Sequence, residues 1–494
     1  MKVVKLLEKW AKEFPHKAAV IFRDELITYR QLRDNTFKLS QALLDLGLKK
    51  GDKVALYIPN SPEYIYGYLA IFSAGLMAVP LDFLLTEDEL FSCLSHSEAK
   101  VLITQEKEGI SLEKLKPRLP HLKKIILPPQ FKKILAQESA CAPQIKVSPE
   151  DLSLIVYSSG TTGWPKGILW NYRHLNSGPQ TIKHFVEINQ DFTLLCCLPF
   201  SHGGGLVFIQ CMVTFGLTIV LMEHFVPLEF LKNIQKYKVH GFFLVPSMYY
   251  VLLSLKELEI FDLSSLKWIN CFGAASSAEA IKKFRRFCPQ AVYHHGWGMM
   301  ETAPPNVILP AGSSKIESIG KAAPWFKVKI VDEQDKEVRT GEIGQLLVKG
   351  WPVMEGYYKD PQLTKAVLKR GWLYSGDVAK VDEEGFIYIL GRVTERIKVG
   401  GLLVYASEVE SVILRYPHVQ EVAVVGKPDE LRGEVPEAFV VLKNGQALPR
   451  NELRYFCRQH LAHFKVPRYF EFMPALPKTK SGKVDKEKLR SEFV

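Results

Sequence analysis

Short runs of apolar residues alternate with longer amphipathic segments along most of the chain. Apolar runs of this length, bounded by turn residues, are typical of strands that are buried on both faces. The runs that fit this description are Lys53–Ile58, Lys100–Gln105, Leu152–Ser159, Phe192–Leu198, Leu217–Met222, Gly241–Pro246 and Lys267–Gly273. Strands of this kind form parallel sheets that are covered by helices. The pattern therefore predicts an α/β protein with doubly wound sheets.

The amino-terminal segment and one charge-free stretch could be mistaken for membrane or export signals. Val3, Leu7, Trp10 and Phe14 follow helical spacing, and lysine or glutamate interrupts every apolar stretch, so we expect an amphipathic helix and no secretory signal. The stretch Phe192–Met222 contains no Asp, Glu, Lys or Arg. Its proline, histidine and glycines divide it into strand, loop, helix and strand, which predicts a buried α/β layer and no transmembrane segment.

The character of the sequence changes in the second half of the chain. Phe326–Gly350 has short alternating strands with Gly and Asp turns, which predicts a barrel or an antiparallel sheet. A further boundary falls at Gly391–Gly401, so we expect a large domain over residues 1–390 and a small α+β domain over residues 391–494. Glu106–Pro149 has the least regular pattern and is predicted to form surface helix and loop.

Composition limits the kind of partner. The 494 residues carry a formal charge of +11 with a pI near 9.0, which favours an anionic partner: nucleic acid, a membrane surface or a phosphorylated small molecule. Lysine and arginine are dispersed along the chain, so we do not expect nucleic-acid binding. The eight cysteines form no CxxC pair, which indicates neither a zinc site nor a disulfide framework and favours a reducing, cytoplasmic location.

The segment Tyr157–Gly167, with sequence YSSGTTGWPKG, follows a predicted strand directly. Ligands of open α/β sheets bind at the carboxyl ends of strands. Gly160 and Gly163 let backbone N–H groups approach a phosphate, and Lys166 adds a positive charge. Hydroxyl donors are Ser158, Ser159, Thr161 and Thr162. The spacing differs from a Walker A loop, so composition alone leaves a connecting turn as the alternative to a phosphate site.

As a whole string, this segment resembles the phosphate-binding motif of the adenylate-forming (ANL) superfamily, which comprises acyl-CoA synthetases, nonribosomal adenylation domains and firefly luciferase. Other segments resemble the motifs of that family in the same order. They are Ile27–Leu32, Gly51–Tyr64, Leu198–Leu206, Gly296–Thr302, Tyr374–Asp377, Gly391–Gly401 and Leu476–Lys486. The resemblance therefore extends over nearly the whole chain.

The resemblance implies the ANL fold: a large domain of stacked doubly wound sheets with a β-barrel-like subdomain, and a small mobile C-terminal domain that swings about a hinge near Thr394. It also implies an AMP-forming acyl-CoA synthetase, an acid–thiol ligase that uses Mg²⁺ and the co-substrates ATP and CoA. A carboxylate attacks the α-phosphate of ATP, pyrophosphate leaves, and the acyl-AMP then transfers its acyl group to CoA.

The resemblance also assigns roles to individual residues. Lys483 would act in adenylation and Lys398 in the second step, after the C-terminal domain has swung. Glu301 and Thr161 would hold the metal. Asp377 and Arg392 would bind the ribose, and Arg392 joins Glu301 and the two lysines in the predicted catalytic set. The predicted ATP-binding residues are Ser158, Ser159, Gly160, Thr161, Thr162, Gly163, Lys166, Gly273, Ala274, Ala275, Trp297, Gly298, Met299, Asp377, Arg392 and Lys483.

The acyl pocket is predicted to involve His202, Phe272 and His295. Phe272 stands where the family often has a small residue, which would shorten the tunnel and favour a small, medium-chain or aromatic acid over a very long fatty acid. His202 either borders the acyl site or packs under the three glycines that follow it. Met300 replaces the usual threonine of its motif, and Thr394 stands where aspartate or lysine is common at the hinge, so the rate and the hinge geometry stay open.

Three functions stay open at this point. The first is an acyl-CoA ligase of fatty-acid or related metabolism. The second is an adenylating enzyme that loads a carrier protein or stops at acyl-AMP, and the third is a nucleotide-binding relative without activity. The sequence leaves the oligomeric state open, a homodimer included.

Overall fold

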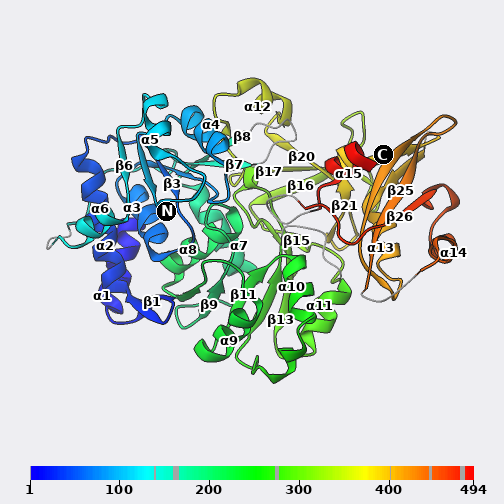
Figure 1. The fold of residues 1–494 in the computed structure, drawn as a ribbon, viewed down its shortest axis with the longest axis horizontal. Helices are drawn as coiled ribbons and strands as arrows, with labels where there is room; N and C mark the ends of the chain where they lie inside the picture. The colour runs from blue at the N-terminus through cyan, green and yellow to red at the C-terminus, as the bar shows by residue number, and fades with distance from the viewer. Residues whose placement is uncertain are drawn as a thin grey trace. The chain divides into compact units, whose positions relative to one another are not determined.

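Parallel strands that are buried on both faces form the framework of the first part of the chain, as the apolar runs predict (Figure 1). The computed structural model describes residues 2–137, 141–158, 166–272, 278–400, 402–443, 448–478 and 484–493. The chain divides into two compact units. Unit 1 is Met1–Gly273, Glu279–Lys327 and Lys349–Leu373, and unit 2 is Ala274–Ala278, Val328–Val348 and Tyr374–Val494.

A nine-stranded sheet of unit 1 has the order β15-β14-β13-β12-β11-β9-β10-β1-β2. The pairs from β1 through β10, β9, β11 and β12 to β13 are parallel, and the outer pairs are antiparallel. Its strands are β1 (Ala18–Phe22), β2 (Glu25–Thr28), β9 (Thr193–Cys196), β10 (Thr218–Leu221), β11 (Gly241–Leu244), β12 (Trp268–Cys271), β13 (Val292–Trp297), β14 (Val307–Ile308) and β15 (Lys321–Ala322).

A seven-stranded sheet of unit 1 has the order β18-β8-β7-β4-β3-β5-β6. The pairs among β7, β4, β3, β5 and β6 are parallel, whereas β8 runs antiparallel to both β7 and β18. The strands are β3 (Lys53–Tyr57), β4 (Met77–Pro80), β5 (Val101–Thr104), β6 (Lys124–Ile126), β7 (Leu152–Ser158), β8 (Lys166–Asn171) and β18 (Gly356–Tyr357). Strand β6 lies in the region that was predicted to hold only helix and loop. It is three residues long, which is too short for its alternation to be recognised.

The helices of unit 1 begin at recognisable caps. Thr28 and Thr86 each form a capping box, with Gln31 and Glu89 respectively, and Ser61 caps α3 ahead of Pro62. The α-helices are α1 (Val3–Glu13), α2 (Tyr29–Asp45), α3 (Pro62–Ser73), α4 (Glu87–Ser97), α5 (Leu112–Leu115), α6 (Pro128–Leu135), α7 (Ser177–Phe185), α8 (Gly203–Phe215), α9 (Pro227–Tyr237), α10 (Pro246–Leu253), α11 (Ala278–Arg285) and α12 (Pro361–Val367). The 3-10 helices are η1 (Lys116–Arg118), η2 (His174–Asn176), η3 (Lys256–Ile260) and η4 (Met300–Thr302).

The charge-free stretch Phe192–Met222 folds as β9, α8 and β10, in the order that the sequence predicts. Helix α8 is buried along most of its length. Among the described residues, every helix is too short or too polar to cross a bilayer.

A third sheet has the order β16-β17-β20-β19, with β21 paired to β20, and corresponds to the predicted barrel-like subdomain. A fourth sheet has the order β23-β22-β25-β24, with β26 paired in parallel to β25. The strands are β16 (Phe326–Val331), β17 (Gly344–Gly350), β19 (Leu368–Lys369), β20 (Trp372–Val381), β21 (Ile387–Arg392), β22 (Arg396–Val399), β23 (Leu402–Tyr405), β24 (Val419–Asp429), β25 (Gly433–Leu442) and β26 (Tyr469–Phe472).

Unit 2 completes its α+β part with a few helices around the fourth sheet. They are η5 (Val393–Glu395), α13 (Ala406–Ile413), α14 (Arg450–His460), η6 (His463–Lys465) and α15 (Lys486–Phe493). The predicted boundary at residue 391 and the predicted hinge at Thr394 lie inside unit 2 and stay predictions.

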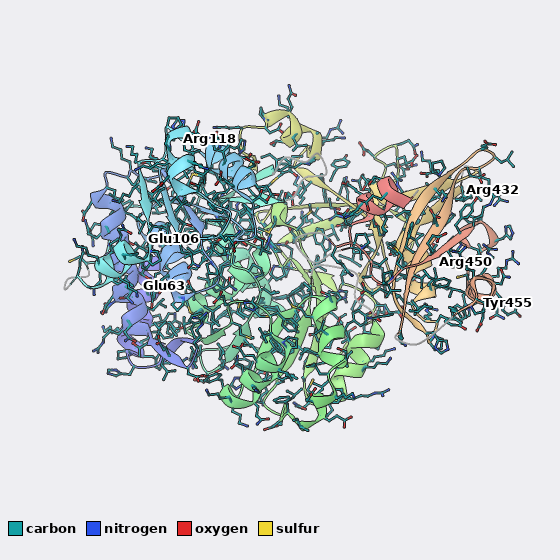
Figure 2. The ribbon with its side chains drawn as sticks, viewed as in Figure 1. Glu63, Glu106, Arg118, Arg432, Arg450 and Tyr455 are labelled. Carbon is teal, nitrogen blue, oxygen red and sulfur yellow. The ribbon has the colours of Figure 1, made fainter. Side chains whose placement is uncertain are left out.

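Basic side chains such as Arg118, Arg432 and Arg450 point outward from different parts of the chain (Figure 2).

Helix α1 is held against the end of α8 by Trp10. The indole Nε1 donates to the carbonyl oxygen of Val213 (2.7 Å), and α8 ends at Gly216, which has a φ of 72°. A Cβ placed on Gly216 would lie 2.7 Å from the indole ring of Trp10. Glycine is therefore required here both for its left-handed backbone and for the close approach of the ring.

We expect Gly216→Ala to lower the free energy of unfolding by about 2–4 kcal/mol, because it combines left-handed strain with overpacking against Trp10. Gly312→Ala is the matched control: Gly312 has a φ of 74°, but a Cβ placed there would have no atom within 4 Å, so only the backbone strain of about 1–2 kcal/mol should remain. The midpoints of urea unfolding measure both effects. Equal losses in the two variants would contradict the packing argument.

Candidate active site

Strand β7 leads into the glycine-rich segment and strand β8 leads out of it. The two strands pair in antiparallel register, with Ser158 opposite Lys166. The segment does follow a strand of an α/β sheet, but the chain returns as a neighbouring strand. This pairing fixes both ends of the predicted phosphate loop. Its residues Ser159, Gly160, Thr161, Thr162 and Gly163 lie outside the described residues.

Glu301 lies in the interior of unit 1, with only 8% of its surface exposed. The hydroxyl of Tyr357 donates to its Oε1 at 2.9 Å, and the amide of Met354 donates to its backbone oxygen at 2.8 Å. Burial and the neighbouring Glu301 carboxylate raise the pKa of Tyr357. The phenol therefore keeps its proton, which it needs in order to donate this bond. Glu301 is accordingly a fixed, buried carboxylate and not a surface residue.

The strand that begins at Lys166 also positions Glu301. Trp170 on β8 donates from Nε1 to the carbonyl oxygen of Met300 at 2.7 Å. Tyr357 lies on β18, which pairs with β8 opposite Ile168. The ammonium of Lys166 lies 5.9 Å from the centre of the Tyr357 ring. Strand β8 therefore carries Lys166 and also contacts the residues that hold the Glu301 carboxylate.

Tyr357 belongs to the candidate site through its bond to Glu301, and sequence analysis missed it. It lies 56 positions from Glu301, and it is one of two adjacent tyrosines in a segment with no regular pattern. Its neighbour Tyr358 has a different partner, Lys53, whose ammonium lies 3.0 Å from the Tyr358 hydroxyl. No sequence signal distinguishes the two tyrosines, since the difference arises only from the pairing of β18 with β8.

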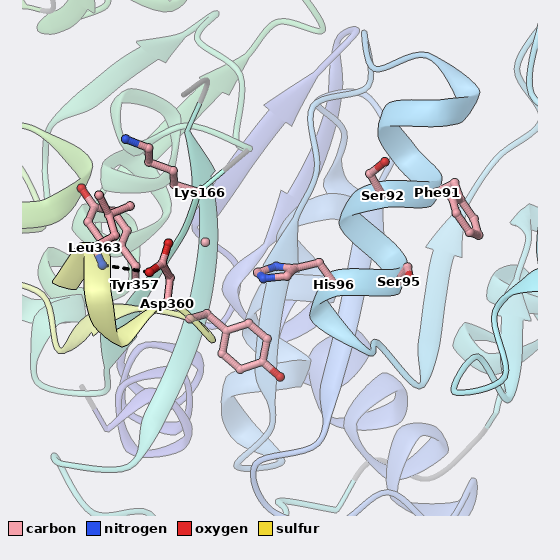
Figure 3. Close-up of a pocket in the computed structure, with 10 residues that line it drawn as sticks. Phe91, Ser92, Ser95, His96, Lys166, Tyr357, Asp360 and Leu363 are labelled. Atoms are coloured by element: carbon pink, nitrogen blue, oxygen red, sulfur yellow. Dashed lines mark hydrogen bonds between the residues drawn. The ribbon is translucent and has the colours of Figure 1, made fainter. Parts of the chain in front are cut away.

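A cavity of about 690 Å³ opens beside these residues (Figure 3). Lys166 and Tyr357 line one side of it, and residues of α4 line the other. The full lining is Phe91, Ser92, Ser95, His96, Lys166, Gly167, Tyr357, Tyr358, Asp360 and Leu363. Burial and, secondarily, the Lys359 ammonium lower the pKa of His96, whose Nδ1 lies 2.8 Å from the hydroxyl of Tyr157. Lys166, at the end of the predicted phosphate loop, therefore faces the same cavity as a partly apolar, mostly uncharged wall.

Asp377 and Arg392, which were predicted together as ribose ligands, form a cross-strand ion pair in unit 2. They lie opposite each other on β20 and β21, and the Arg392 Nε is 2.9 Å from Asp377 Oδ1. The Arg392 Nη1 also donates to the carbonyl oxygen of Ser375 at 3.0 Å. Asp377 is 5% exposed, and its amide donates to the Ser375 hydroxyl oxygen at 3.0 Å. The structure thus brings this predicted pair together and orients the carboxylate.

The remaining predicted ATP-binding residues of the large domain are only partly described. Gly273, Ala274 and Ala275 lie outside the described residues. Trp297 ends β13, and its ring lies 6.3 Å from that of Phe326. The following Gly298 is tightly packed, because a Cβ there would lie 2.4 Å from the Pro304 Cβ. Met299 is the N-cap residue of η4, the short helix that carries Glu301, and its backbone amide donates a hydrogen bond to Thr302 Oγ1 at 3.1 Å.

Phe272 and Met300 fill space that glycines leave open. A Cβ on Gly296 would lie 1.8 Å from the Phe272 Cε1, so the phenylalanine ring covers the Gly296 backbone. A Cβ on Gly203 would lie 2.9 Å from the sulfur of Met300. The departure at Met300 is therefore accommodated by the first residue of the glycine run at α8.

The two histidines predicted for the acyl pocket have different surroundings. His202 is the N-cap residue of α8, and its Nε2 lies 3.0 Å from Asp82 Oδ2, with 40% of the side chain exposed. His202 thus lies directly before the three glycines and beside Asp82, and its role at the acyl site stays a prediction. His295 is buried, and its Nδ1 lies 3.1 Å from the carbonyl oxygen of Ser318. Burial lowers the pKa of His295 to about 4, so the ring is neutral at physiological pH.

The two predicted catalytic lysines differ in what the structure describes. Lys398 has an exposed side chain on β22, and its amide donates to Glu434 Oε2 at 2.9 Å. Lys483 lies outside the described residues. Thr394 lies in η5, directly before β22. Lys166 and Glu301 belong to unit 1, whereas Asp377, Arg392 and Lys398 belong to unit 2.

Each unit taken by itself has groups whose chemistry suits part of an anionic nucleotide. In unit 1, Lys166 provides a cation at the end of the predicted loop. In unit 2, the Asp377 carboxylate can accept from vicinal hydroxyls. Among the described residues, no cluster of three or more His, Cys, Asp or Glu side chains could hold a metal ion alone. Mg²⁺ in nucleotide sites needs only one or two carboxylates, because phosphate oxygens and water complete its shell. Glu301 therefore fits a magnesium ion that arrives with a nucleotide.

Comparison with known proteins agrees with this chemistry. Residues 7–358 match the family model of the AMP-binding enzyme, and residues 408–483 match that of the AMP-binding enzyme C-terminal domain. The long-chain-fatty-acid–CoA ligase of Bacillus subtilis (strain 168) is 33% identical, covering 99% of this chain and 94% of that protein. The feruloyl-CoA synthase of Amycolatopsis sp is 32% identical, covering 98% and 97%.

Solved structures give the same answer. The anthranilate CoA ligase AuaEII in complex with anthranoyl-AMP has a TM-score of 0.91 at 28% identity, covering 99% of this chain and 97% of that one. ATP-bound MatB from Rhodopseudomonas palustris has a TM-score of 0.91 at 27% identity, covering 99% of both chains. The fold, the order of the motifs and the full-length similarity together place this chain in the AMP-binding enzyme family, the ANL superfamily, within its branch of ATP-using, AMP-forming acid–CoA ligases.

Proposed function

We propose that this protein activates a small, medium-chain or aromatic carboxylic acid as its acyl-AMP and transfers the acyl group to CoA. The observation that carries the proposal is the buried Glu301, held by Tyr357 next to the strand that begins at Lys166. A lysine at one end of the predicted loop and a buried carboxylate held beside the same strand suit an anionic, metal-bound triphosphate. Transfer to a carrier protein is the alternative for the second step. An enzyme that delivers its acyl group to a separate carrier protein would have the same sequence as one that uses free CoA.

In the first step, a carboxylate oxygen of the acid bonds to the α-phosphorus of ATP while the bond from that phosphorus to the bridging oxygen breaks. Pyrophosphate leaves with the electron pair. Lys483 would attract both the acid and the α-phosphate, and Lys166 would bind the outer phosphates. Asp377, oriented by Arg392, would accept from the ribose hydroxyls. Glu301 and Thr161 would hold Mg²⁺, which when bound offsets phosphate charge.

In the second step, the thiolate sulfur of CoA bonds to the acyl carbonyl carbon, and AMP leaves with the bridging oxygen. The thiol proton goes to solvent. Lys398 would act here, after rotation about Thr394.

All eight cysteines of the protein are thiols, and seven of them are buried. We place the enzyme in the cytoplasm, where thiols stay reduced.

The environment of Phe272 supports the proposed substrate class. Its ring covers Gly296, lies 5.6 Å from the Phe243 ring, and occupies space at the ends of β12 and β13. In the acyl pocket proposed here, a long acyl chain would need that space. The two relatives described above are named for a long-chain fatty acid and for an aromatic acid, so family membership leaves the acid open.

We expect pyrophosphate release that depends on the added acid, with octanoate or an aromatic acid preferred over palmitate. A screen of carboxylic acids with ATP, with and without CoA, measures both steps. Thioester formation with free CoA supports the ligase, whereas acid-dependent exchange of pyrophosphate without thioester supports carrier loading. Absence of exchange with every acid would refute the adenylation step, and a preference for palmitate over octanoate of more than about tenfold would refute the role of Phe272.

We expect Lys483→Ala to abolish adenylation but to leave thioester formation from supplied acyl-AMP largely intact, because each lysine serves one step. Lys398→Ala should do the reverse. Pyrophosphate exchange and single-step thioester formation measure the two activities separately. If both variants lose both activities equally, the assignment of one lysine to each step is wrong.

We expect Tyr357→Phe to slow adenylation about tenfold or more, because a hydrogen bond to a carboxylate contributes about 1.5–3 kcal/mol. Tyr358→Phe is the control, since it removes the neighbouring hydroxyl of the same cavity, which contacts Lys53 and not Glu301. The rate of pyrophosphate exchange at saturating ATP, titrated with Mg²⁺, compares them. Similar effects of the two substitutions would show that the bond to Glu301 has no special role.

A further inference from the structure

Lys486 lies at the start of α15, three residues after Lys483, and is bonded to two carboxylates at once. Its Nζ is 2.9 Å from Glu395 Oε2 and 2.8 Å from Glu410 Oε1. Only 17% of the Lys486 side chain is exposed. Burial acts to lower the pKa of this lysine, but the two carboxylates outweigh burial and raise it. The ammonium group is therefore charged and held between two elements of unit 2.

Glu410 is the fixed side of this arrangement. It lies on α13, and 17% of its side chain is exposed. Its Oε1 also accepts from the amide of Val424 on β24 at 2.7 Å. Because the same carboxylate is bonded to the sheet and to Lys486, the start of α15 is fixed to the fourth sheet.

Glu395 lies next to the predicted hinge. It is the last residue of η5 and directly follows Thr394. The guanidinium of Arg490 lies 3.5 Å from the carbonyl oxygen of Thr394. Lys486 and Arg490 are one helical turn apart and therefore share a face of α15. That face contacts residues 394 and 395 together.

The segment that carries Lys483 is closed at its base. Lys478 and Val484 form an antiparallel bridge, and the amide of Asp485 donates to the carbonyl oxygen of Pro477 at 2.8 Å. Lys478 also pairs with Glu421 on β24. The ends of the segment are thus fixed, and the next anchored residue along the chain is Lys486.

From this geometry, and resting on the proposed function, we propose that Lys486 is a positioning residue for adenylation. It ties the described residues that flank Lys483 to Glu395, so that these flanks move as one body with everything that follows the predicted hinge. Rotation is thereby confined to the bonds before Glu395. The strand that carries Lys398 does not need the tie, because β22 is held by its pairing with β23 and β25.

We expect Lys486→Gln to slow pyrophosphate exchange by about tenfold or more, with the KM for ATP nearly unchanged, because misplacing a catalytic group reduces the rate of the step it serves. Thioester formation from supplied acyl-AMP should fall less than about threefold. Lys486→Arg should restore exchange, since a guanidinium can also bridge two carboxylates. Glu395→Gln should repeat the defect of Lys486→Gln. Lys488→Gln is the control, because it removes a charge from the same helix. Among the described ion pairs, Lys488 pairs only with Glu492, so this substitution should change neither step.

Equal losses in both steps would show that Lys486 is merely structural and would overturn the proposal. Failure of Lys486→Arg to restore pyrophosphate exchange would do the same. A second measurement does not depend on activity. Hydrogen exchange of a peptide covering residues 477–485 should be faster in Lys486→Gln than in the wild type, while peptides from β24 and β25 stay unchanged. Unchanged exchange of that peptide would also overturn the proposal. An inactive wild type would refute the proposed function alone. The hydrogen-exchange measurement would still decide whether Lys486 holds the residues that flank Lys483.

Discussion

A carboxyl group that is taken out of water needs hydrogen bonds or cations inside the protein, and the geometry around Glu301 follows from this need. Tyr357 donates to the carboxylate, but it can do so only because β18 pairs with β8. The indole of Trp170 on β8 fixes the backbone next to Glu301. The loop ends, the carboxylate and its donor are therefore parts of one hydrogen-bonded framework, and the antiparallel strand β8 is its centre.

Much of the fold was predictable from local patterns. The apolar runs became the parallel strands, and the charge-free stretch Phe192–Met222 became β9, α8 and β10, because strands buried on both faces leave a strong signal in the sequence. The short strand β6 and the antiparallel return of β8 were not predicted. Their pairing depends on partners far along the chain, and a strand of three residues has almost no alternation of its own.

The candidate site divides in the same way. Glu301, Asp377 and Arg392 occur in recognisable motifs, and the structure buries the first and pairs the other two. Tyr357, Asp82 and Lys486 were not singled out, since the partner of each comes from another part of the chain. A motif names the group that meets the ligand. The residue that orients this group is selected by tertiary packing, and packing is not written in a short string of residues.

The opposed positions of Ser158 and Lys166 have one more consequence. Since the strands already bring the two ends of the glycine-rich segment together, the sheet supplies the closure and the segment itself need not. Lengthening or shortening that segment would leave the pairing of β7 and β8 intact. The limits on the residues of this segment therefore come from what it binds and not from the stability of the sheet.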